Sequence, residues 1–481
     1  MEKNHAASGD CRYNRISFYL NGESITLDLP PGITSLEMLN QELNMYGTKC
    51  SCNEGDCGAC TVVIAYPRAG TIVYEAINSC LYPAARLHGK HLITIEGLGT
   101  PEDLHPIQQA ILDHHASQCG YCTPGFVMSL FALLAGTLNP DAESILAALE
   151  GNLCRCTGYQ SILEAAQELS ASMNPQSVLP DFCRMIEPKL FAFDTAVSES
   201  LAPKDSPRLI KHYHKAQSTT ELHSFLAAYP QARLIAGGTD IMVQVNVGRK
   251  HFEHLIDLGD IPELQEIQLK RDGIHIGAGV SYSQLMDSGI IKCDLPCLVD
   301  LCRLIASKQI RNFGTLAGNI ANASPVGDSL PLLLVLEAKL ILASAQQMRE
   351  IKISEFFLDY RQTALQKGEY IREIIIPSPP RDAFIQTRKS SKRKSVDISS
   401  VVSAIRIDKS GKALLAFGGV AATPVLSTVF REHFQAGADL ATLAEKIVTE
   451  YAPLSDVRGS AEYRSKMIYN HILQYREAYH G

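Results

Sequence analysis

The spacing of the cysteines constrains this chain more than any other feature of its sequence. Near the N-terminus, cysteines follow the pattern C-x4-C-x2-C with a distant fourth member. They are Cys52, Cys57, Cys60 and Cys80. This pattern is typical of a plant-type 2Fe-2S cluster, because two irons need four thiolate ligands. Gly55 and Gly58 favour the same interpretation, since a tight loop must turn its amides toward the sulfurs where side chains would obstruct them.

Two alternatives remain open for this first set of cysteines. A structural zinc site is one, although zinc sites prefer paired C-x2-C knuckles and this spacing differs from that arrangement. The second concerns the ligands themselves. Cys50 lies two residues before Cys52, so it is either a spare thiol or a rival to Cys52 as a ligand.

The segments around this loop predict a sheet with a packed helix. Apolar and polar residues alternate on both sides of Asn21-Gly22, which predicts a β-hairpin. Thr34 and Glu37 form a capping-box signature, so a helix is expected to begin there. A strand is expected over 61–66, directly after the third cysteine of the set.

A second set of cysteines lies in a region of helical periodicity and combines C-x2-C with a later C-x-C pair. It consists of Cys119, Cys122, Cys154 and Cys156. Four helices are predicted, beginning near His105-Pro106, Thr123-Pro124, Asn139-Pro140 and Gln160. Helix N-termini favour thiolates and negatively charged clusters. A C-x-C pair is unusual for zinc and poor for a disulfide, and no βαβ pattern supports a thioredoxin-like motif, so a second 2Fe-2S cluster is preferred.

The second half of the chain begins after residues 173–208, which we interpret as a linker because prolines and serines interrupt any periodicity. Beyond it, a short strand leads into the glycine-rich turn at 237–240, whose amides can hold a phosphate. A loop of small and amide residues at 311–328 also suits a diphosphate, and Asp328 could accept from a ribose hydroxyl. The alternatives are an ordinary turn and a polar surface loop. No G-x-G-x-x-G motif occurs, so a Rossmann domain is not expected.

Composition argues against two classes of protein. A formal net charge of -7 is unlike that of nucleic-acid binders, which normally show a basic face. No apolar run approaches the roughly 20 residues that a membrane span needs. Residues 1–15 are polar and lack the apolar core of a secretory signal, so we expect no membrane association and a cytoplasmic location.

Three motifs together resemble the iron–sulfur part of the xanthine dehydrogenase family. They are Cys-Asn-Glu-Gly-Asp-Cys-Gly-Ala-Cys-Thr at 52–61, Gln-Cys-Gly-Tyr-Cys-Thr-Pro-Gly at 118–125 and Gly-Asn-Leu-Cys-Arg-Cys-Thr-Gly-Tyr at 151–159. The resemblance implies that the 119–156 cluster lies nearest a molybdopterin, which Gln118 would contact. It also implies that the 52–80 cluster lies nearer a flavin.

The resemblance covers nearly the whole chain from about residue 15 and implies a multidomain α+β fold. The expected domains are a β-grasp ferredoxin-like domain at 1–95, a four-helix 2Fe-2S bundle at 96–172, the linker at 173–208, a two-part α/β FAD domain of the PCMH type at 209–378, and a small α/β C-terminal flavoprotein domain at 379–481.

The flavin ligands follow from the same resemblance. The positions that fall at the family's FAD contacts are Ala236, Gly237, Gly238, Thr239, Asp240, Gly318, Asn319, Asn322, Ser324 and Asp328. Gly327 stands where family members often have serine, which would remove one hydrogen bond to the nucleotide. Lys389 belongs to a basic run at 388–394 that lies beside the flavin in the family. We expect Lys389 to tune the reduction potential of the flavin or to contact an anionic nicotinamide nucleotide. The alternative is that the basic run is a solvated loop.

The order of domains, without a molybdenum domain, resembles the small subunit of the two-chain bacterial members of the family. The resemblance implies a large partner subunit that holds molybdopterin, in a heterodimer that pairs into a heterotetramer. Electrons from xanthine or hypoxanthine oxidation would cross both 2Fe-2S clusters to FAD and then to NAD. The alternatives are a subunit of another molybdenum hydroxylase, acting on an aldehyde or N-heterocycle, and a ferredoxin-like carrier without flavin.

No catalytic residue is predicted in this chain, because no Ser-His-Asp or paired-carboxylate pattern stands out and cofactors would supply the chemistry. His251 and His254 have possible ligand spacing. We expect them to be solvated, because no acidic or thiol partner completes a site in the sequence.

Overall fold

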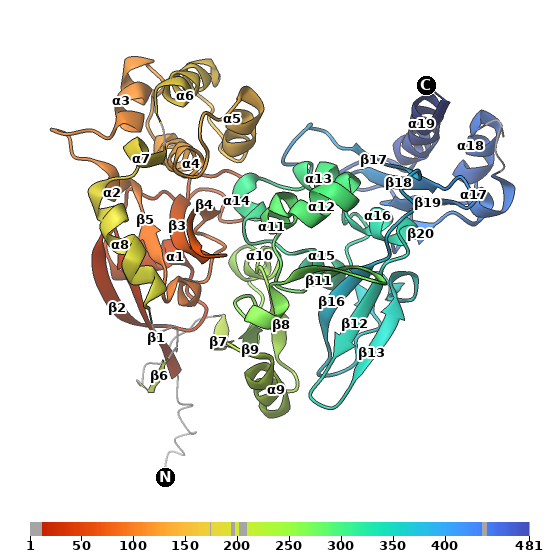
Figure 1. The fold of residues 1–481 in the computed structure, drawn as a ribbon, viewed down its shortest axis with the longest axis horizontal. Coiled ribbons are helices and arrows are strands. Elements are labelled where there is room, and N and C mark those ends of the chain that lie inside the picture. The colour runs from red at the N-terminus through yellow and green to blue at the C-terminus, as the bar shows by residue number, and fades with distance from the viewer. Residues whose placement is uncertain (1–11, 174, 194–197, 202–208, 435–439, 481) are drawn as a thin grey trace, which may run out of the picture. The chain divides into compact units, whose positions relative to one another are not determined.

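The computed structural model describes residues 12–173, 175–193, 198–201, 209–434 and 440–480 (Figure 1). The chain divides into two compact units. Unit 1 comprises Met1–Gln217, Ala232–Asp257 and Ser307–Phe313, and unit 2 comprises Ser218–Gln231, Leu258–Ala306 and Gly314–Gly481. Residues 1–11, on which the expected lack of a signal sequence partly rests, lie outside the described residues.

Unit 1 begins with a sheet of order β2-β1-β5-β3-β4, in which β6 also pairs with β1. Its strands are β1 (Arg12–Leu20), β2 (Glu23–Leu29), β3 (Thr61–Arg68), β4 (Thr71–Asn78), β5 (His91–Ile93) and β6 (Ser198–Leu201). The predicted hairpin is confirmed, with Asn21 and Gly22 at positive φ in its turn. The capping box of Thr34 and Glu37 is also confirmed. It begins α1 (Ser35–Glu37), which continues as the π-helical turn η1 (Met38–Glu42).

The four predicted helices of the next segment are all present. They are α3 (Pro106–Asp113), α4 (Thr123–Gly136), α5 (Ala142–Leu149) and α6 (Gln160–Ser172). Helix α4 is apolar on nearly every side, so it is buried among the other helices and against β3 and β4. The bundle therefore shares one hydrophobic core with a face of the N-terminal sheet, through residues such as Val63 and Phe131.

The segment interpreted as a linker contains regular structure of its own. Helices α7 (Pro175–Val178) and α8 (Asp181–Phe191) follow α6, and residues 174, 194–197 and 202–208 lie outside the described residues. Cys183, Ile186 and Leu190 recur at helical spacing along α8 and are buried in the bundle core. Pro180 before this helix and Pro188 inside it obscure that periodicity in the sequence.

A third part of unit 1 comes from the segment expected to form the FAD domain. It contains the parallel sheet β7-β9-β8, with β7 (Ile210–Lys215), β8 (Arg233–Ile235) and β9 (Phe252–Asp257), and the helices α10 (Ile241–Asn246) and α14 (Lys308–Arg311). Ile210, Leu255 and Met242 lie in the same hydrophobic cluster as Phe18 and Leu36 of the N-terminal domain. This half of the flavin segment is thus packed as part of the iron–sulfur unit.

Helix α14 is inserted between the two cysteine-bearing domains of unit 1. Gln309 is fully buried, and its Nε2 donates to Ser129 Oγ and Asn152 Oδ1, both at 3.0 Å. Arg311 is buried as well and forms an ion pair with Glu150 at 3.1 Å. The short helix therefore adds polar partners to Glu150 and to the pair of Ser129 and Asn152, which are also hydrogen-bonded to each other.

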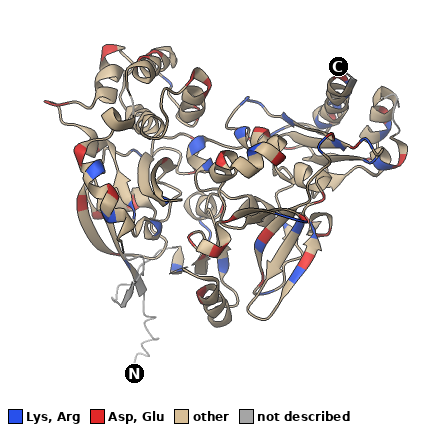
Figure 2. Cartoon of the chain, in the orientation of Figure 1, with Lys and Arg blue, Asp and Glu red and all other residues tan. Residues whose placement is uncertain are grey.

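Unit 2 holds a second sheet, of order β10-β11-β16-β12-β13. Its strands are β10 (Ile267–Lys270), β11 (Gly273–Gly277), β12 (Lys339–Ala343), β13 (Met348–Lys352) and β16 (Tyr370–Ile376). Figure 2 shows acidic and basic residues mixed along these strands, and the pairs Lys339–Glu350 and Arg349–Glu369 each close at 2.8 Å. The other elements of this part are α9 (Thr219–Ala228), η3 (Pro262–Leu264), α11 (Tyr282–Asp287), α12 (Gly289–Asp294), α13 (Pro296–Arg303), α15 (Leu316–Asn322), α16 (Leu330–Val335), η4 (Ile353–Glu355), β14 (Phe357–Asp359) and β15 (Gln362–Thr363).

The C-terminal part of unit 2 is a sheet of order β17-β18-β19-β20 with helices. Its elements are β17 (Phe384–Ser390), β18 (Val401–Ile407), β19 (Ala413–Gly418), β20 (Val425–Leu426), α17 (Thr428–His433), α18 (Leu440–Val448) and α19 (Ala461–His480). One face of the sheet packs on α16, through Ala404, Leu414 and Ala416. The mixed helix and strand architecture confirms the expected multidomain fold class. Among the described residues, no helix is long and apolar enough to cross a membrane.

The burial of Gln309 leads to a prediction about stability. Replacing Gln309 by alanine should lower the free energy of unfolding by about 1–3 kcal/mol, because Ser129 and Asn152 lose a buried partner. Urea denaturation of the chain measures this change. Gln109→Ala is the matched control, since Gln109 is exposed on α3 and its loss should cost less than about 0.5 kcal/mol. Equal losses in the two variants would contradict a buried role for α14.

Candidate cofactor sites

The first set of cysteines lies at one end of the N-terminal sheet. Cys52 and Cys57 lie in the loop between η1 and β3, Cys60 immediately precedes β3, and Cys80 follows β4. The Sγ atoms of Cys60 and Cys80 are 3.3 Å apart and buried. Gly55 has a φ of +86° in this loop, a backbone conformation that a residue with a Cβ rarely adopts.

The sulfurs of this set influence one another's protonation. A hydrogen bond with Cys57 lowers the pKa of Cys52, and the same bond raises the pKa of Cys57. Cys60 and Cys80 form a second such pair, in which the pKa of Cys60 is lowered and that of Cys80 is raised by their shared hydrogen bond. Four thiolates cannot coexist here without positive charge between them. Two ferric irons supply that charge, so the donor set fits a 2Fe-2S cluster.

The second set lies at the helix ends of the bundle and is more exposed. The Sγ atoms of Cys119 and Cys156 are 3.7 Å apart, and both residues are exposed. Burial, followed by a hydrogen bond with Cys154, raises the pKa of Cys122 to about 12. Burial opposes ionisation of Cys154, but the hydroxyl and N–H of Thr157 donate to its sulfur at 3.2 and 3.4 Å and lower its pKa. The structure therefore brings together the members of each predicted cysteine set.

The two cysteine-bearing loops contact each other directly. The N–H of Leu153, next to Cys154, donates to the carbonyl of Cys57 at 2.9 Å. The side-chain amide of Asn152 donates to the Gly58 carbonyl at 3.1 Å. A cysteine of the second set is thus joined to a cysteine of the first by one peptide unit and one hydrogen bond.

Cys50 is exposed beside the first set, and its carbonyl accepts a hydrogen bond from the hydroxyl of Tyr121. Burial, then repulsion from Cys60 and Cys52, raises the pKa of the Cys50 thiol. The Cys52 sulfur shares a hydrogen bond with Cys57 and accepts one from the N–H of Glu54 at 3.5 Å, which places it within the set. The geometry therefore favours Cys52 as the fourth ligand.

The first predicted flavin loop lies in unit 1, between β8 and α10. Its positive-φ residue is Gly238, at +88°. Arg86, from the short helix η2 (Ala84–Leu87) of the N-terminal domain, donates to the carbonyls of Ala236 and Gly237, the latter at 2.9 Å. Arg86 also forms a buried ion pair with Asp257 at the end of β9. Burial opposes the charge of Arg86, but the Asp257 carboxylate outweighs it and raises the pKa of Arg86.

Sequence analysis missed Arg86 and Asp257, because they are 171 residues apart and neither belongs to a motif. A second link in unit 1 was missed for the same reason. Asn246, at the end of α10, donates from its side chain to the carbonyls of Asn53 at 3.1 Å and Cys80 at 2.8 Å. The segment that carries the first flavin loop therefore rests on the backbone of the first cysteine set.

The second predicted flavin segment, 311–328, lies in unit 2 from Gly314 onward and is not wholly a loop. Residues 316–322 form α15, whose N-cap Thr315 accepts from the N–H of Gly318 at 3.0 Å. Glycine and asparagine are weak helix formers, which is why the sequence indicated a loop. Burial of Leu316 and Ile320 outweighs that tendency. Of the expected ligands, Gly318, Asn319 and Asn322 lie on the helix, and Ser324 and Asp328 follow it.

Asp328 and Lys389, both predicted to lie at the flavin, contact each other. Lys389 lies on β17, and its ammonium donates to Asp328 Oδ2 and to the Leu304 carbonyl, both at 2.7 Å. The hydroxyl of Ser399 donates to Asp328 Oδ1 at 2.5 Å. Lys389 is therefore not part of a solvated loop, because only 4% of its side chain is exposed. Lys392 and Arg393, further along the basic run, are exposed.

The C-terminal sheet also contacts the turn that follows α15 and contains Asp328. The N–H of Gly419, at the end of β19, donates to the Pro325 carbonyl at 2.8 Å. Ser324 and Asp328 thus lie on a turn that is fixed at both sides by the C-terminal part of unit 2.

Four family models match the chain, and together they cover most of it. They are described as a 2Fe-2S iron-sulfur cluster binding domain at 18–81, a [2Fe-2S] binding domain at 94–167, an FAD binding domain in molybdopterin dehydrogenase at 208–379, and a CO dehydrogenase flavoprotein C-terminal domain at 386–476. The four domains define an iron–sulfur flavoprotein.

Known relatives show which iron–sulfur flavoproteins the chain is similar to. The chain is 32% identical to the xanthine dehydrogenase of Emericella nidulans, over 93% of this chain and 36% of the relative. It is 33% identical to the xanthine dehydrogenase/oxidase of Mus musculus, over 85% of this chain and 34% of the relative. The chain thus spans about a third of the length of these relatives.

Solved structures agree with the sequence relatives. A chain of carbon monoxide dehydrogenase from Hydrogenophaga pseudoflava, which lacks the Mo-pyranopterin moiety of its molybdenum cofactor, matches with a TM-score of 0.53 and 28% identity, over 56% of this chain and 96% of that one. A chain of quinoline 2-oxidoreductase from Pseudomonas putida 86 matches with a TM-score of 0.51 and 25% identity, over 55% and 94%. The chain belongs to the molybdenum hydroxylase family, of which it carries the 2Fe-2S and FAD domains.

The choice between Cys50 and Cys52 leads to a prediction about iron content. Cys52→Ser should lower iron from about four to about two per chain and remove one cluster EPR signal, because the first set loses a thiolate. Cys50→Ser should leave both unchanged. Iron, acid-labile sulfide and EPR of the reduced protein measure the effect. The reverse result, with loss of iron only in Cys50→Ser, would make Cys50 the ligand.

The contacts of Arg86 lead to a prediction about flavin content. In Arg86→Lys, FAD per chain should fall several-fold while iron is retained, because one ammonium cannot replace a guanidinium that contacts two carbonyls and a carboxylate. Absorbance and iron analysis of the purified chain measure both. Arg68→Lys is the control, since Arg68 forms a partly exposed pair with Glu75. Full FAD occupancy in Arg86→Lys would leave Arg86 with a purely structural role.

Proposed function

We propose that this chain is the electron-transfer subunit of a xanthine dehydrogenase. Electrons pass from a molybdenum centre in a partner subunit to the second cluster, then to the first cluster, to FAD and finally to NAD. The observation that carries the proposal is the direct link between the two cysteine sets, in which Leu153 N–H donates to the Cys57 carbonyl at 2.9 Å.

The order of the two clusters is supported by their surroundings. Cys119 and Cys156 of the second set are exposed, as an entry point for electrons from another chain must be. Cys60 and Cys80 of the first set are buried, and the carbonyl of Cys80 accepts from Asn246 of the segment that carries a flavin loop. Within unit 1, the chain of contacts therefore runs from the surface set, through the buried set, to that loop.

Each predicted flavin segment, taken by itself, supplies groups that suit part of FAD. Backbone groups around Gly237 and Gly238 suit a phosphate, and they are held by Arg86. On the second segment, the amides of Asn319 and Asn322 and the hydroxyl of Ser324 supply donors for a diphosphate. When bound, FAD accepts electrons one at a time from clusters and returns them as a hydride.

The partner and the substrate come from the relatives. The Hydrogenophaga chain belongs to a molybdenum enzyme, and 56% of this chain matches nearly all of it. We take this as support for an enzyme that distributes its cofactors over several chains, in a heterodimer that pairs into a heterotetramer. The relatives at 32–33% identity are xanthine dehydrogenases, which favours hypoxanthine and xanthine as substrates and NAD as the acceptor.

A second candidate is a subunit of a different molybdenum hydroxylase. The quinoline 2-oxidoreductase chain, at a TM-score of 0.51, favours an N-heterocycle as the substrate in that case. Substrate choice would lie with the partner subunit, so the same electron path would serve either enzyme.

The test uses the complex with its molybdenum partner, purified anaerobically. In the wild type, both xanthine and NADH should bleach the flavin and both clusters. In Cys156→Ser, xanthine should no longer reduce the flavin, whereas NADH should still reduce the flavin and the first cluster. EPR and flavin absorbance follow each centre. Cys293→Ser is the control, because Cys293 is an exposed cysteine outside both sets.

Three outcomes would contradict the proposal. Rapid flavin reduction by xanthine in Cys156→Ser would place the second cluster off the path. Flavin that is absent from repeated preparations would favour a carrier without flavin. Reduction by quinoline but not by xanthine would favour the second candidate.

A further inference from the structure

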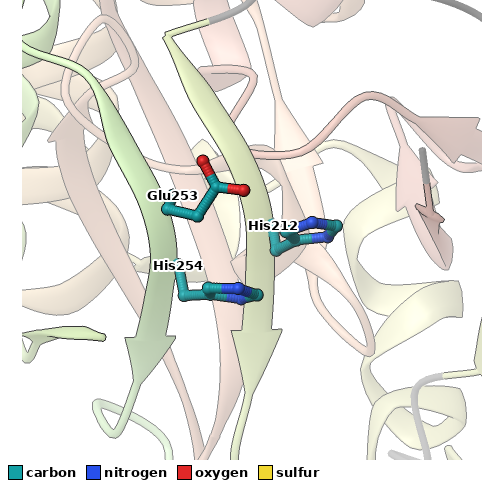
Figure 3. A group of neighbouring side chains, drawn as sticks. All are labelled: His212, Glu253 and His254. Atoms are coloured by element: carbon teal, nitrogen blue, oxygen red, sulfur yellow. The ribbon is translucent and has the colours of Figure 1, made fainter. Parts of the chain in front are cut away.

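A group of metal-ligating side chains lies outside both cysteine sets, on the parallel sheet of unit 1. Figure 3 shows His212 on β7 and Glu253 and His254 on β9. One ligand atom from each of the three residues lies within 4.8 Å of the others. Parallel pairing of β7 with β9 sets His212 directly opposite His254, so the sheet register itself creates the group. The expectation that no acidic partner completes a site at His254 is therefore wrong.

The imidazoles of His212 and His254 are stacked on each other in the structure. Their ring centroids are 4.5 Å apart and their planes differ by 14°. Imidazole binds a metal through a nitrogen lone pair in the plane of its ring, so one of the two rings turns about its side-chain torsions when both bind the same ion.

A third histidine orients the group. The Nε2 of His214 lies 3.1 Å from the Nδ1 of His254. When His254 binds a metal through Nε2, its Nδ1–H can donate to His214, which is how metal-bound histidines are usually held in place. His214 is buried, whereas His212 and His254 are half-buried and Glu253 is exposed. The ligands are thus reachable from solvent, and the orienting residue is not.

We propose that His212, Glu253 and His254 bind one divalent transition metal of the Zn²⁺ type. Two imidazoles and one carboxylate are a common zinc donor set that leaves a coordination position for water, whereas Mg²⁺ and Ca²⁺ prefer oxygen ligands alone. The metal would join the edge strand β7 to β9. It would therefore stiffen the sheet whose β9 ends at Asp257, the partner of Arg86.

The test measures zinc on the full chain with its clusters loaded. Chelator-washed protein is equilibrated with Zn²⁺ and desalted, and zinc and iron are then counted by mass spectrometry. The wild type should retain about one zinc per chain with its iron unchanged. His212→Ala and His254→Ala should each weaken zinc binding at least tenfold, and Glu253→Gln should weaken it less. His251→Ala is the matched control, because His251 is an exposed histidine just before β9 and should retain zinc fully.

X-ray absorption at the zinc edge distinguishes this site from the cysteine sets. Binding at the histidines gives nitrogen and oxygen neighbours at about 2.0–2.1 Å, whereas zinc on cysteines gives sulfur at about 2.3 Å. Iron content also reports whether each variant is folded. Equal zinc retention in His212→Ala and the wild type, sulfur neighbours, or zinc that appears only as iron is lost would overturn the proposal.

Discussion

The buried pair of Arg86 and Asp257 is the contact on which the arrangement of unit 1 depends. Its partners come from the N-terminal iron–sulfur domain and from the end of β9, and the same guanidinium reaches the carbonyls of Ala236 and Gly237. Removing one member of such a pair leaves an uncompensated charge in the interior, at a cost of about 3–5 kcal/mol. The turn predicted to bind flavin is thereby tied to the domain that holds Cys80, six residues before Arg86 in the chain.

A second constraint is how closely the two cluster loops approach each other. A Cβ on Gly125 would lie 2.3 Å from the Gly58 carbonyl, and one on Gly58 would lie 2.4 Å from the Gly151 carbonyl. Real Cβ atoms do not come that close to backbone oxygen, so both positions require glycine. The same approach lets Leu153 donate to Cys57. Glycine in these motifs therefore serves the contact between the loops as well as the wrapping of each cluster.

The sequence predicted features that are written in short spacings. The Asn21-Gly22 hairpin and the Thr34 capping box depend on residues within a few positions of each other, and each cysteine set contains the short spacings C-x4-C-x2-C, C-x2-C or C-x-C. Sequence analysis failed where two interacting residues are distant along the chain. Arg86 finds Asp257 through tertiary packing, and His212 meets His254 only because β7 and β9 pair in parallel. Helix α15 was missed for a different reason, since burial outweighs the weak helical propensity of its glycine and asparagines.

In unit 2, hydrogen bonds from distant residues change the role that the sequence predicted for Asp328. Both carboxylate oxygens already accept hydrogen bonds, one from Lys389 and one from Ser399. A ribose hydroxyl would therefore have to share an oxygen with one of these donors, which a carboxylate allows because each oxygen has two lone pairs. Lys389 in turn offsets the charge of Asp328 and has little solvent around it. Its effect on a nearby flavin would be that of a neutralised pair rather than of a free cation, which weakens the case for Lys389 as a direct contact of an anionic nucleotide.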